Sequence, residues 1–203
     1  MKIINLKKED KALYRPFSKD VAIVEVPGFQ FIMIDGAGDP ATSKEFQDAI
    51  EALYSLSYIL KFETKKGVLA IDYGLMPLEI LWWADDMSAF TQNRQQEWRW
   101  TAMIRQPEFI TRRMYDQAVA KVGTKKNPVA LNKVRLESYV EGRCAQRLHI
   151  GSFEEAAVTI AAVHERIDQE GGTEKGKHHE IYLSDMRKTA PEKWKTIVRQ
   201  PFG

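Results

Sequence analysis

The stretch WTAMIRQP, residues 100–107, returns near the carboxyl terminus as WKTIVRQP, residues 194–201, and this duplication decides the fold. Each copy closes a segment with a glycine-terminated apolar run, a helical stretch and a second apolar run, so the repeat covers a supersecondary unit. We therefore predict an α+β fold made of two pseudo-symmetric strand–helix–strand–strand units. Their antiparallel sheets should surround a central groove, because a seam between similar units is a natural cleft for a small molecule.

The repeat divides the chain, which we expect to form one domain over residues 1–203, into four parts. A charged N-terminal arm with apolar anchors at Leu13, Tyr14 and Phe17 comes first. The predicted boundaries are 1–20 for this arm, 21–107 for the first repeat unit, 108–128 for a linking helix and 129–203 for the second repeat unit.

Apolar runs predict the strands, and apolar residues at helical spacing predict the helices. The runs 21–26 and 29–35 are split by Pro27-Gly28, which indicates either a broken strand or a tight hairpin. Long helices should begin near Ser43 and Ser152. The other predicted strands are residues 76–83, 97–105, 134–140, 143–150, 178–183 and 194–199.

Charge and composition exclude several classes of protein. A net charge of +2 gives no electrostatic footprint for nucleic acid, and the short arm cannot form a DNA-binding headpiece. No apolar run approaches the ~20 residues of a membrane span, and the amino terminus lacks the apolar core of a signal peptide. The single cysteine, Cys144, excludes an internal disulfide. We expect a cytoplasmic protein that binds neither DNA nor membranes.

One predicted strand, HHEIYL at residues 178–183, carries the candidate chemistry. Period-two alternation places its isoleucine and leucine on one face, which we expect to lie against a helix. It places His178, Glu180 and Tyr182 on the other face. These three side chains should therefore point away from the helix and toward the groove.

The corresponding strand of the first unit supplies a second carboxylate. Glu79 aligns with Glu180 and Leu81 with Tyr182, so we expect both glutamates to meet in one cleft. A carboxylate among aromatic groups is costly unless it is paired, protonated or offered a cation, so the arrangement suits a cationic ligand or a general base. The alternative is that both glutamates are ordinary solvated residues on an exposed face.

Five tryptophans fall in or beside the second and third strands of the two units, where alternation sends some of them to the groove. Trp82 shares a face with Ile80 and is expected in the core, whereas Trp83 lies on the Glu79 face and should form a cleft wall. The candidate ligand-binding residues are Glu79, Leu81, Trp83, Trp98, Trp100, His178 and Trp194, and the candidate catalytic residues are Glu180 and Tyr182.

Neither a metal nor another cofactor is predicted. The adjacent His178 and His179 point to opposite faces of a strand, and no cysteine lies near them. The turn 36–38, Gly-Ala-Gly, lacks the full phosphate-binding fingerprint and is explained by a tight turn before a helix.

Four motifs resemble those of the stand-alone GyrI-like (gyrase-inhibitor-like) small-molecule-binding proteins, which are related to the cyclopropanoid cyclopropyl hydrolases. They are MIDGAGDP at 33–40, GRCAQRLHIGSF at 142–153, HHEIYLSD at 178–185 and APEKWKT at 190–196. The resemblance implies two strand–helix–strand–strand units around a groove. Relatives fused to helix-turn-helix headpieces sense drugs with an acidic residue and aromatic walls. Some stand-alone relatives are hydrolases that open the cyclopropane ring of DNA-alkylating natural products.

Three hypotheses follow from the residues and the resemblance. The first is a groove that binds bulky planar, hydrophobic or cationic small molecules. The second is cofactor-independent hydrolysis, in which Glu180 accepts a proton from water and Tyr182 hydrogen-bonds the carbonyl oxygen on which charge develops. The third is a non-enzymatic module that sequesters a drug or inhibits a protein such as gyrase. For inhibition of a protein, the sequence offers no specific residue and identifies no partner.

Overall fold

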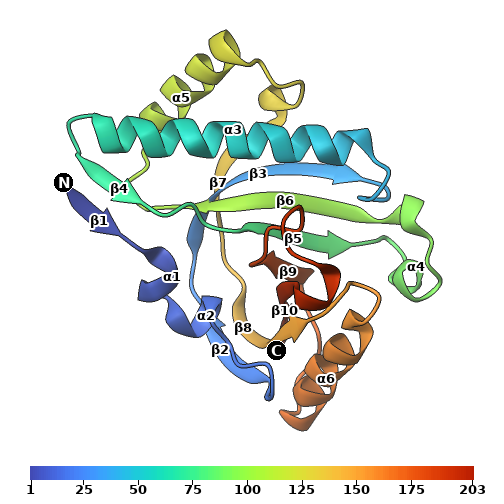
Figure 1. Cartoon of the computed structure of the whole chain (residues 1–203). Helices are drawn as coiled ribbons and strands as arrows, with labels where there is room; N and C mark the ends of the chain where they lie inside the picture. Colours follow the sequence, from blue (N-terminus) through green and yellow to red (C-terminus); the bar gives the residue numbers. More distant parts are fainter. The chain divides into compact units, whose positions relative to one another are not determined.

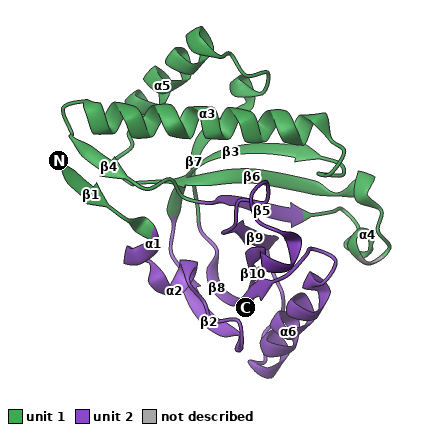
Figure 2. Ribbon diagram, viewed as in Figure 1, with its two compact units in different colours: residues 1–6, 29–76, 83–139 green, residues 7–28, 77–82, 140–203 purple. Residues whose placement is uncertain are grey.

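The computed structural model describes residues 1–203, apart from the side chain of Thr91. The chain forms two compact units, each built from several segments (Figure 2). Unit 1 contains residues 1–6, 29–76 and 83–139, and unit 2 contains residues 7–28, 77–82 and 140–203. Both units combine helices with antiparallel strands, which confirms the α+β class.

Unit 1 contains an antiparallel sheet under a long helix (Figure 1). Its strand order is β6 (Arg99–Gln106), β3 (Phe29–Ala37), β7 (Arg135–Tyr139). Helix α3 (Lys44–Lys66) packs on β3 and β6. It begins after Ser43, whose hydroxyl accepts a hydrogen bond from the backbone N–H of Phe46 and so caps the helix.

Trp100 on β6 belongs to the core of unit 1. Its side chain is fully buried, and its ring meets the ring of Phe46 edge to face at a centroid distance of 5.0 Å. Gly36 on β3 makes room for the indole, because a Cβ at that position would lie 2.2 Å from it. The prediction that Trp100 lines a ligand site is therefore wrong, because α3 and β3 enclose this ring.

The other elements of unit 1 surround this layer. Helix α5 (Arg112–Lys125) lies beside α3, within the range 108–128 where a helix was expected. Two short strands that the sequence analysis missed, β1 (Lys2–Ile4) and β4 (Ile71–Tyr73), pair in parallel. Other short helices of the chain are α1 (Leu6–Glu9), α4 (Ser88–Thr91), η1 (Gln95–Glu97), η2 (Leu131–Lys133) and, near the C-terminus, η3 (Pro191–Lys193).

Unit 2 contains a five-stranded antiparallel sheet. Helix α6 (Ala156–Gln169) packs over β8 and β10, where Ala145, Val163, Ile167, Val198 and Phe202 form a buried apolar cluster. The strand order is β2 (Ala22–Val26), β8 (Gly142–Ile150), β10 (Lys195–Pro201), β9 (His178–Tyr182), β5 (Leu78–Trp83), with the last residue of β5 assigned to unit 1.

The N-terminal arm is built into unit 2 through helix α2 (Lys11–Tyr14). Leu13 and Tyr14 are buried, as predicted for anchors, but Phe17 is 82% exposed and anchors nothing. The backbone carbonyls of Ala12 and Leu13 accept hydrogen bonds from side chains of β8 and β10, at 2.8 and 2.9 Å. The arm therefore covers the face of the sheet on which those side chains lie.

The register of β9 with β10 decides which face each candidate residue occupies. Glu180 pairs with Val198, which lies in the α6 cluster, whereas His179 pairs with Arg199, which contacts the arm. Paired residues share a face of the sheet. Glu180 therefore lies on the same face as α6, and the prediction that it points away from the helix is wrong.

The chain path also differs from the expected hairpin at Pro27-Gly28. Strand β2 belongs to unit 2 and pairs with β8, while β3 belongs to unit 1 and pairs with β6 and β7. The other predicted strands and helices are all present, with ends displaced by a few residues. Within the described residues, no helix is long and apolar enough to cross a membrane.

Candidate functional site

A cluster of one carboxylate and several rings lies on the α6 face of unit 2, on strands β5 and β9. We call it the Glu180 cluster, and it consists of Trp82, Phe153, His178, Glu180, Tyr182 and Trp194. The antiparallel register sets Ile80 opposite Glu180 and Trp82 opposite His178, which brings the Trp82 indole to the carboxylate.

The carboxylate of Glu180 is held by three side chains of the same cluster. Its Oε2 accepts hydrogen bonds from Trp82 Nε1 at 3.1 Å and from Tyr182 Oη at 2.5 Å. Its Oε1 lies 3.6 Å from His178 Nε2, and the side chain is 13% exposed. Burial alone would raise the pKa of Glu180, but the contacts with His178, Tyr182 and Trp82 outweigh it and lower the pKa. The group is therefore an ionised carboxylate that solvent can still reach.

Tyr182 remains a neutral phenol in this environment. Burial, followed by the charge of Glu180, raises the pKa of Tyr182 well above its ordinary value. Its proton is directed at Glu180 Oε2. Tyr182 thus stabilises the ionised form of Glu180.

Aromatic side chains from two further segments adjoin Tyr182. The ring of Phe153, ahead of α6, meets the Tyr182 ring edge to face at 5.7 Å and lies tilted on Trp194 at 5.2 Å. Trp194 is anchored by a hydrogen bond from its Nε1 to the carbonyl of Thr189, at 2.7 Å. Phe153 is 41% exposed, so an exposed ring lies against Tyr182, which donates to the carboxylate. Rings next to an ionised carboxylate can hold a flat cation by stacking and charge.

Glu79 and Leu81 do not join this cluster. Glu79 pairs with Ile181 and Leu81 with His179, so both side chains lie on the opposite face of the sheet from Glu180. The prediction of two glutamates in one cleft is wrong, as is the alignment of Leu81 with Tyr182. The reason is the register of β5 with β9, which are neighbours in one sheet. A shift of one residue in this pairing moves every side chain of a strand to the opposite face.

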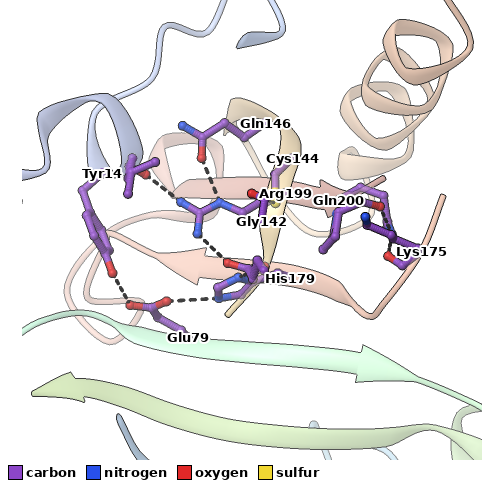
Figure 3. A network of polar contacts seen from close by, with 12 residues as sticks. Tyr14, Glu79, Gly142, Cys144, Gln146, Lys175, His179, Arg199 and Gln200 are labelled. Carbon is purple, nitrogen blue, oxygen red and sulfur yellow. Dashed lines mark hydrogen bonds and ion pairs between the residues drawn. The ribbon is translucent and has the colours of Figure 1, made fainter. Parts of the chain in front are cut away.

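Glu79 belongs instead to a buried polar network (Figure 3). Its Oε1 accepts a hydrogen bond from Tyr14 Oη at 3.0 Å, and its Oε2 lies 3.1 Å from His179 Nε2. The second contact is an ion pair whose N–H is poorly aligned for a hydrogen bond. On its other side, His179 Nδ1 lies 2.9 Å from Glu141 Oε1, and Glu141 Oε2 lies 2.8 Å from Arg199 Nη1.

The charges in this network balance when His179 is an imidazolium. Both ring nitrogens face carboxylate oxygens, which only accept hydrogen bonds. Burial alone would lower the pKa of His179, but Glu141 and Glu79 outweigh it and raise the pKa. Burial would raise the pKa of Glu141, but His179 and Arg199 lower it to about 2. The network thus contains two carboxylates and two cations, which suits a structural role.

The remaining candidate tryptophans, Trp83 and Trp98, lie in unit 1. Trp98 is half-buried and stacks on Phe90 at 5.0 Å. Trp83 lines a hollow of about 600 Å³ together with Asp35, Gly36, Ala37, Asp85, Gln96, Glu97 and Arg99. Two carboxylates of this hollow already have cations, since Asp35 pairs with Arg135 and Asp85 with Arg99. A ligand role for Trp83 and Trp98 stays a prediction.

Sequence reasoning missed Trp82 and Phe153. Trp82 is buried, as expected of a residue that shares a face with Ile80, but its indole also donates to Glu180 on that face, which was not predicted. Phe153 lies within the motif at 142–153, which was a signal for the family but not for a role of its ring. Among the described residues, no group of three or more His, Cys, Asp and Glu side chains could hold a metal ion.

Comparison with family models identifies one family. The model of the GyrI-like small molecule binding domain matches residues 19–201. An uncharacterized conserved protein from Listeria innocua is 37% identical, with 98% of this chain and 100% of that chain covered and a TM-score of 0.91. A protein from Listeria innocua described as a hydrolase is 38% identical, with the same coverage and a TM-score of 0.86.

A more distant solved structure shares the fold alone. The C-terminal domain of EcmrR is 9% identical, with 91% of this chain and 97% of that chain covered and a TM-score of 0.55. The search of curated proteins found no significant match.

Proposed function

Because the chain belongs to the GyrI-like family of small-molecule-binding domains, we propose that it binds bulky planar, hydrophobic or cationic molecules at the Glu180 cluster. The observation that carries this proposal is the carboxylate of Glu180, which its contacts with His178, Tyr182 and Trp82 keep ionised. The exposed ring of Phe153 lies against Tyr182. A flat cation would therefore gain a charge partner and a stacking surface together.

Fluorescence titration tests this proposal, because Trp82 and Trp194 both lie in the cluster. Wild-type protein is titrated with ethidium, a planar cation, and with coumarin 6, a neutral planar dye. Glu180→Gln should weaken ethidium binding about 10- to 100-fold, since a charged partner is lost, and should leave coumarin binding nearly unchanged.

Glu192→Gln is the matched control, because it removes the same charge from an exposed residue of unit 2 outside the cluster. It should leave the affinity for both dyes at the wild-type value. Absence of micromolar binding by either dye, or equal ethidium affinity in Glu180→Gln and wild type, would refute the proposal.

Hydrolysis is a second candidate, favoured by a 38% identical relative described as a hydrolase. For an activated cyclopropane, water attacks a ring carbon and forms a C–O bond while the ring C–C bond breaks. The released electron pair moves to the conjugated carbonyl oxygen, the water proton goes to Glu180, and that proton later returns to the oxygen. Tyr182 would hydrogen-bond this oxygen after leaving its present contact with Glu180.

Mass spectrometry separates catalysis from binding. A cyclopropane-containing alkylator is incubated with a small molar fraction of protein, and water addition over many turnovers is expected. The addition should disappear in Glu180→Gln and persist in Glu192→Gln. Unchanged substrate, or one stoichiometric adduct, would leave binding alone.

A further inference from the structure

We propose that Tyr14, which precedes the matched family domain at residues 19–201, is a positioning residue for Glu180 and acts through the contact of Glu79 with His179. The ligand-binding part of this inference rests on the proposed function. The positioning part concerns the unliganded protein and can be tested without a ligand.

Strands β5 and β9 are joined by side chains on both faces of the sheet. On one face, Trp82 of β5 donates a hydrogen bond to Glu180 of β9. On the opposite face, Glu79 of β5 contacts His179 of β9 at 3.1 Å. The two contacts join nearby residues of the same two backbone-paired strands, so a shift of β5 against β9 at one contact also moves the other. The buried pair of Glu79 and His179 thus helps to place the carboxylate of Glu180 against the Trp82 indole.

Tyr14 determines how firmly the buried pair is held. The side chains of Glu79 and His179 are fully buried, and Tyr14 Oη donates to the Glu79 oxygen that does not face His179. Without this hydroxyl, a buried carboxylate oxygen loses a donor, which is costly in a dry environment. The carboxylate would then turn toward the imidazolium and shift β5 against β9 within their backbone pairing.

The arm that carries Tyr14 is fixed in place by the same network. Arg199 Nη2 donates to the Leu13 carbonyl at 2.9 Å, and Gln146 Nε2 donates to the Ala12 carbonyl at 2.8 Å. Arg199 Nε in turn donates to Gln146 Oε1 at 2.9 Å (Figure 3). Arg199 also donates from Nη1 to Glu141, which contacts His179. Side chains of the buried polar network therefore connect helix α2 with strands β5, β9 and β10.

The Trp82 indole proton reports the position of the Glu180 carboxylate directly. Amide and indole resonances are recorded on ¹⁵N-labelled wild type, Tyr14→Phe and Tyr115→Phe, with the indole peaks assigned from Trp→Phe variants. Tyr115→Phe is the matched control, because this buried tyrosine of unit 1 also donates one hydrogen bond, to the Val134 carbonyl at 2.6 Å. We expect Tyr14→Phe to move the Trp82 indole resonance and Tyr115→Phe to leave it in place.

The indole of Trp194 serves as an internal reference, because it bonds to the Thr189 carbonyl and should stay unmoved in both variants. Should Tyr14→Phe fail to fold, Glu79→Gln makes the same test, because a neutral amide loses its attraction to His179 and the Trp82 indole should again move. An unmoved Trp82 indole in the folded variant overturns the positioning role whether or not any dye binds.

Binding then tests the consequence for a ligand. Tyr14→Phe should weaken ethidium binding about three- to tenfold and leave coumarin 6 binding unchanged, while Tyr115→Phe changes neither. Equal loss for both dyes, or no loss for ethidium, overturns the inference, since a general loosening would not distinguish charge. Failure of wild type to bind ethidium refutes the proposed function and the ligand-binding part together, and the indole resonances still decide the positioning part.

Discussion

Glu79 and Glu180 lie on opposite faces of the unit 2 sheet, and their carboxylates have different surroundings. Glu79, opposite the α6 face, is fully buried and meets a cation, the His179 imidazolium. Glu180, on the α6 face, contacts His178, accepts hydrogen bonds from Trp82 and Tyr182, and is 13% exposed. The first carboxylate is enclosed in a fully buried charge network, whereas the second is kept ionised where solvent reaches it. Access to solvent therefore separates a structural carboxylate from one suited to a ligand.

The largest loss of stability should come from removing a charge from the buried network around His179. Arg199→Met removes a buried cation that bonds Glu141, Gln146 and the arm, and leaves Glu141 without this partner. Breaking a buried ion pair in this way costs about 3–5 kcal/mol of unfolding free energy. Urea denaturation monitored by circular dichroism measures the loss.

Arg187→Met provides the control for that experiment. Arg187 pairs with Asp185 at 3.0 Å, and its side chain is 86% exposed. Exposed pairs contribute about 0–1 kcal/mol, so this variant should stay close to wild type. Similar losses in the two variants would contradict the distinction between buried and exposed charge.

On the α6 face, Trp82→Phe should have the next largest effect. The variant removes a hydrogen bond to an ionised group, which is worth about 1.5–3 kcal/mol, and removes one contribution that lowers the pKa of Glu180. The pKa of Glu180 should therefore rise, as measured by ¹³C NMR of the labelled carboxyl group.

Trp194→Phe makes the same change of ring on a tryptophan whose indole bonds to a backbone carbonyl. It should leave the pKa of Glu180 unchanged. A rise of equal size in both variants would show that general loss of packing, and not the Trp82 donor, controls the carboxylate.

A third test uses pH to sharpen the contrast between the faces. Because its carboxylate partners raise the folded-state pKa of His179 above the ordinary 6.5, the unfolded chain releases this proton first as pH rises. The stabilisation is complete below pH 6.5 and is lost as pH rises toward the folded pKa, by up to about 1.4 kcal/mol per pH unit. Urea midpoints between about pH 6 and 8.5 measure this slope.

Glu141→Gln removes a charge that raises the pKa of His179, so the folded-state pKa should fall. The pH-dependent loss of unfolding free energy should therefore end at a lower pH than in wild type. Besides Glu141, the groups to consider around His179 are Glu79, which faces its other nitrogen, and Arg199, which shares Glu141. Glu137→Gln, on an exposed residue of unit 1, should retain the wild-type profile. Identical profiles for all three proteins would refute the assigned charge of His179.

These contrasts mark the limit of what the sequence predicts. Periodicity correctly placed His178, Glu180 and Tyr182 on one face of a strand, because alternation is a local property. It could not place Glu79, because that depends on the register of β5 with β9, which pairs Ile80 with Glu180.

The local sequence pattern likewise could not predict which face of the sheet α6 covers. Ile181 is fully buried, as a residue against a helix would be, but it lies on the same face as His179, where the arm also packs. Both faces of this sheet are covered over part of their area, so burial alone does not identify the helix side. The charged network was missed for the same reason, since Glu141, His179 and Arg199 come from separate segments that only the tertiary fold brings together.

The smallest effect should come from Phe153→Leu, which tests the aromatic part of the Glu180 cluster separately from its charge. The ring of Phe153 contacts those of Tyr182 and Trp194, and such pairs contribute about 0.5–1.5 kcal/mol. A flat ligand that stacks on this surface should lose about two- to tenfold in affinity, and ethidium and coumarin 6 should lose equally, because stacking does not depend on the charge of Glu180. Phe17→Leu, on a ring of unit 2 that is 82% exposed, is the control and should change neither affinity. If Phe153→Leu affected ethidium alone, the ring would act through the carboxylate, and the separation of charge from stacking on this face would be wrong.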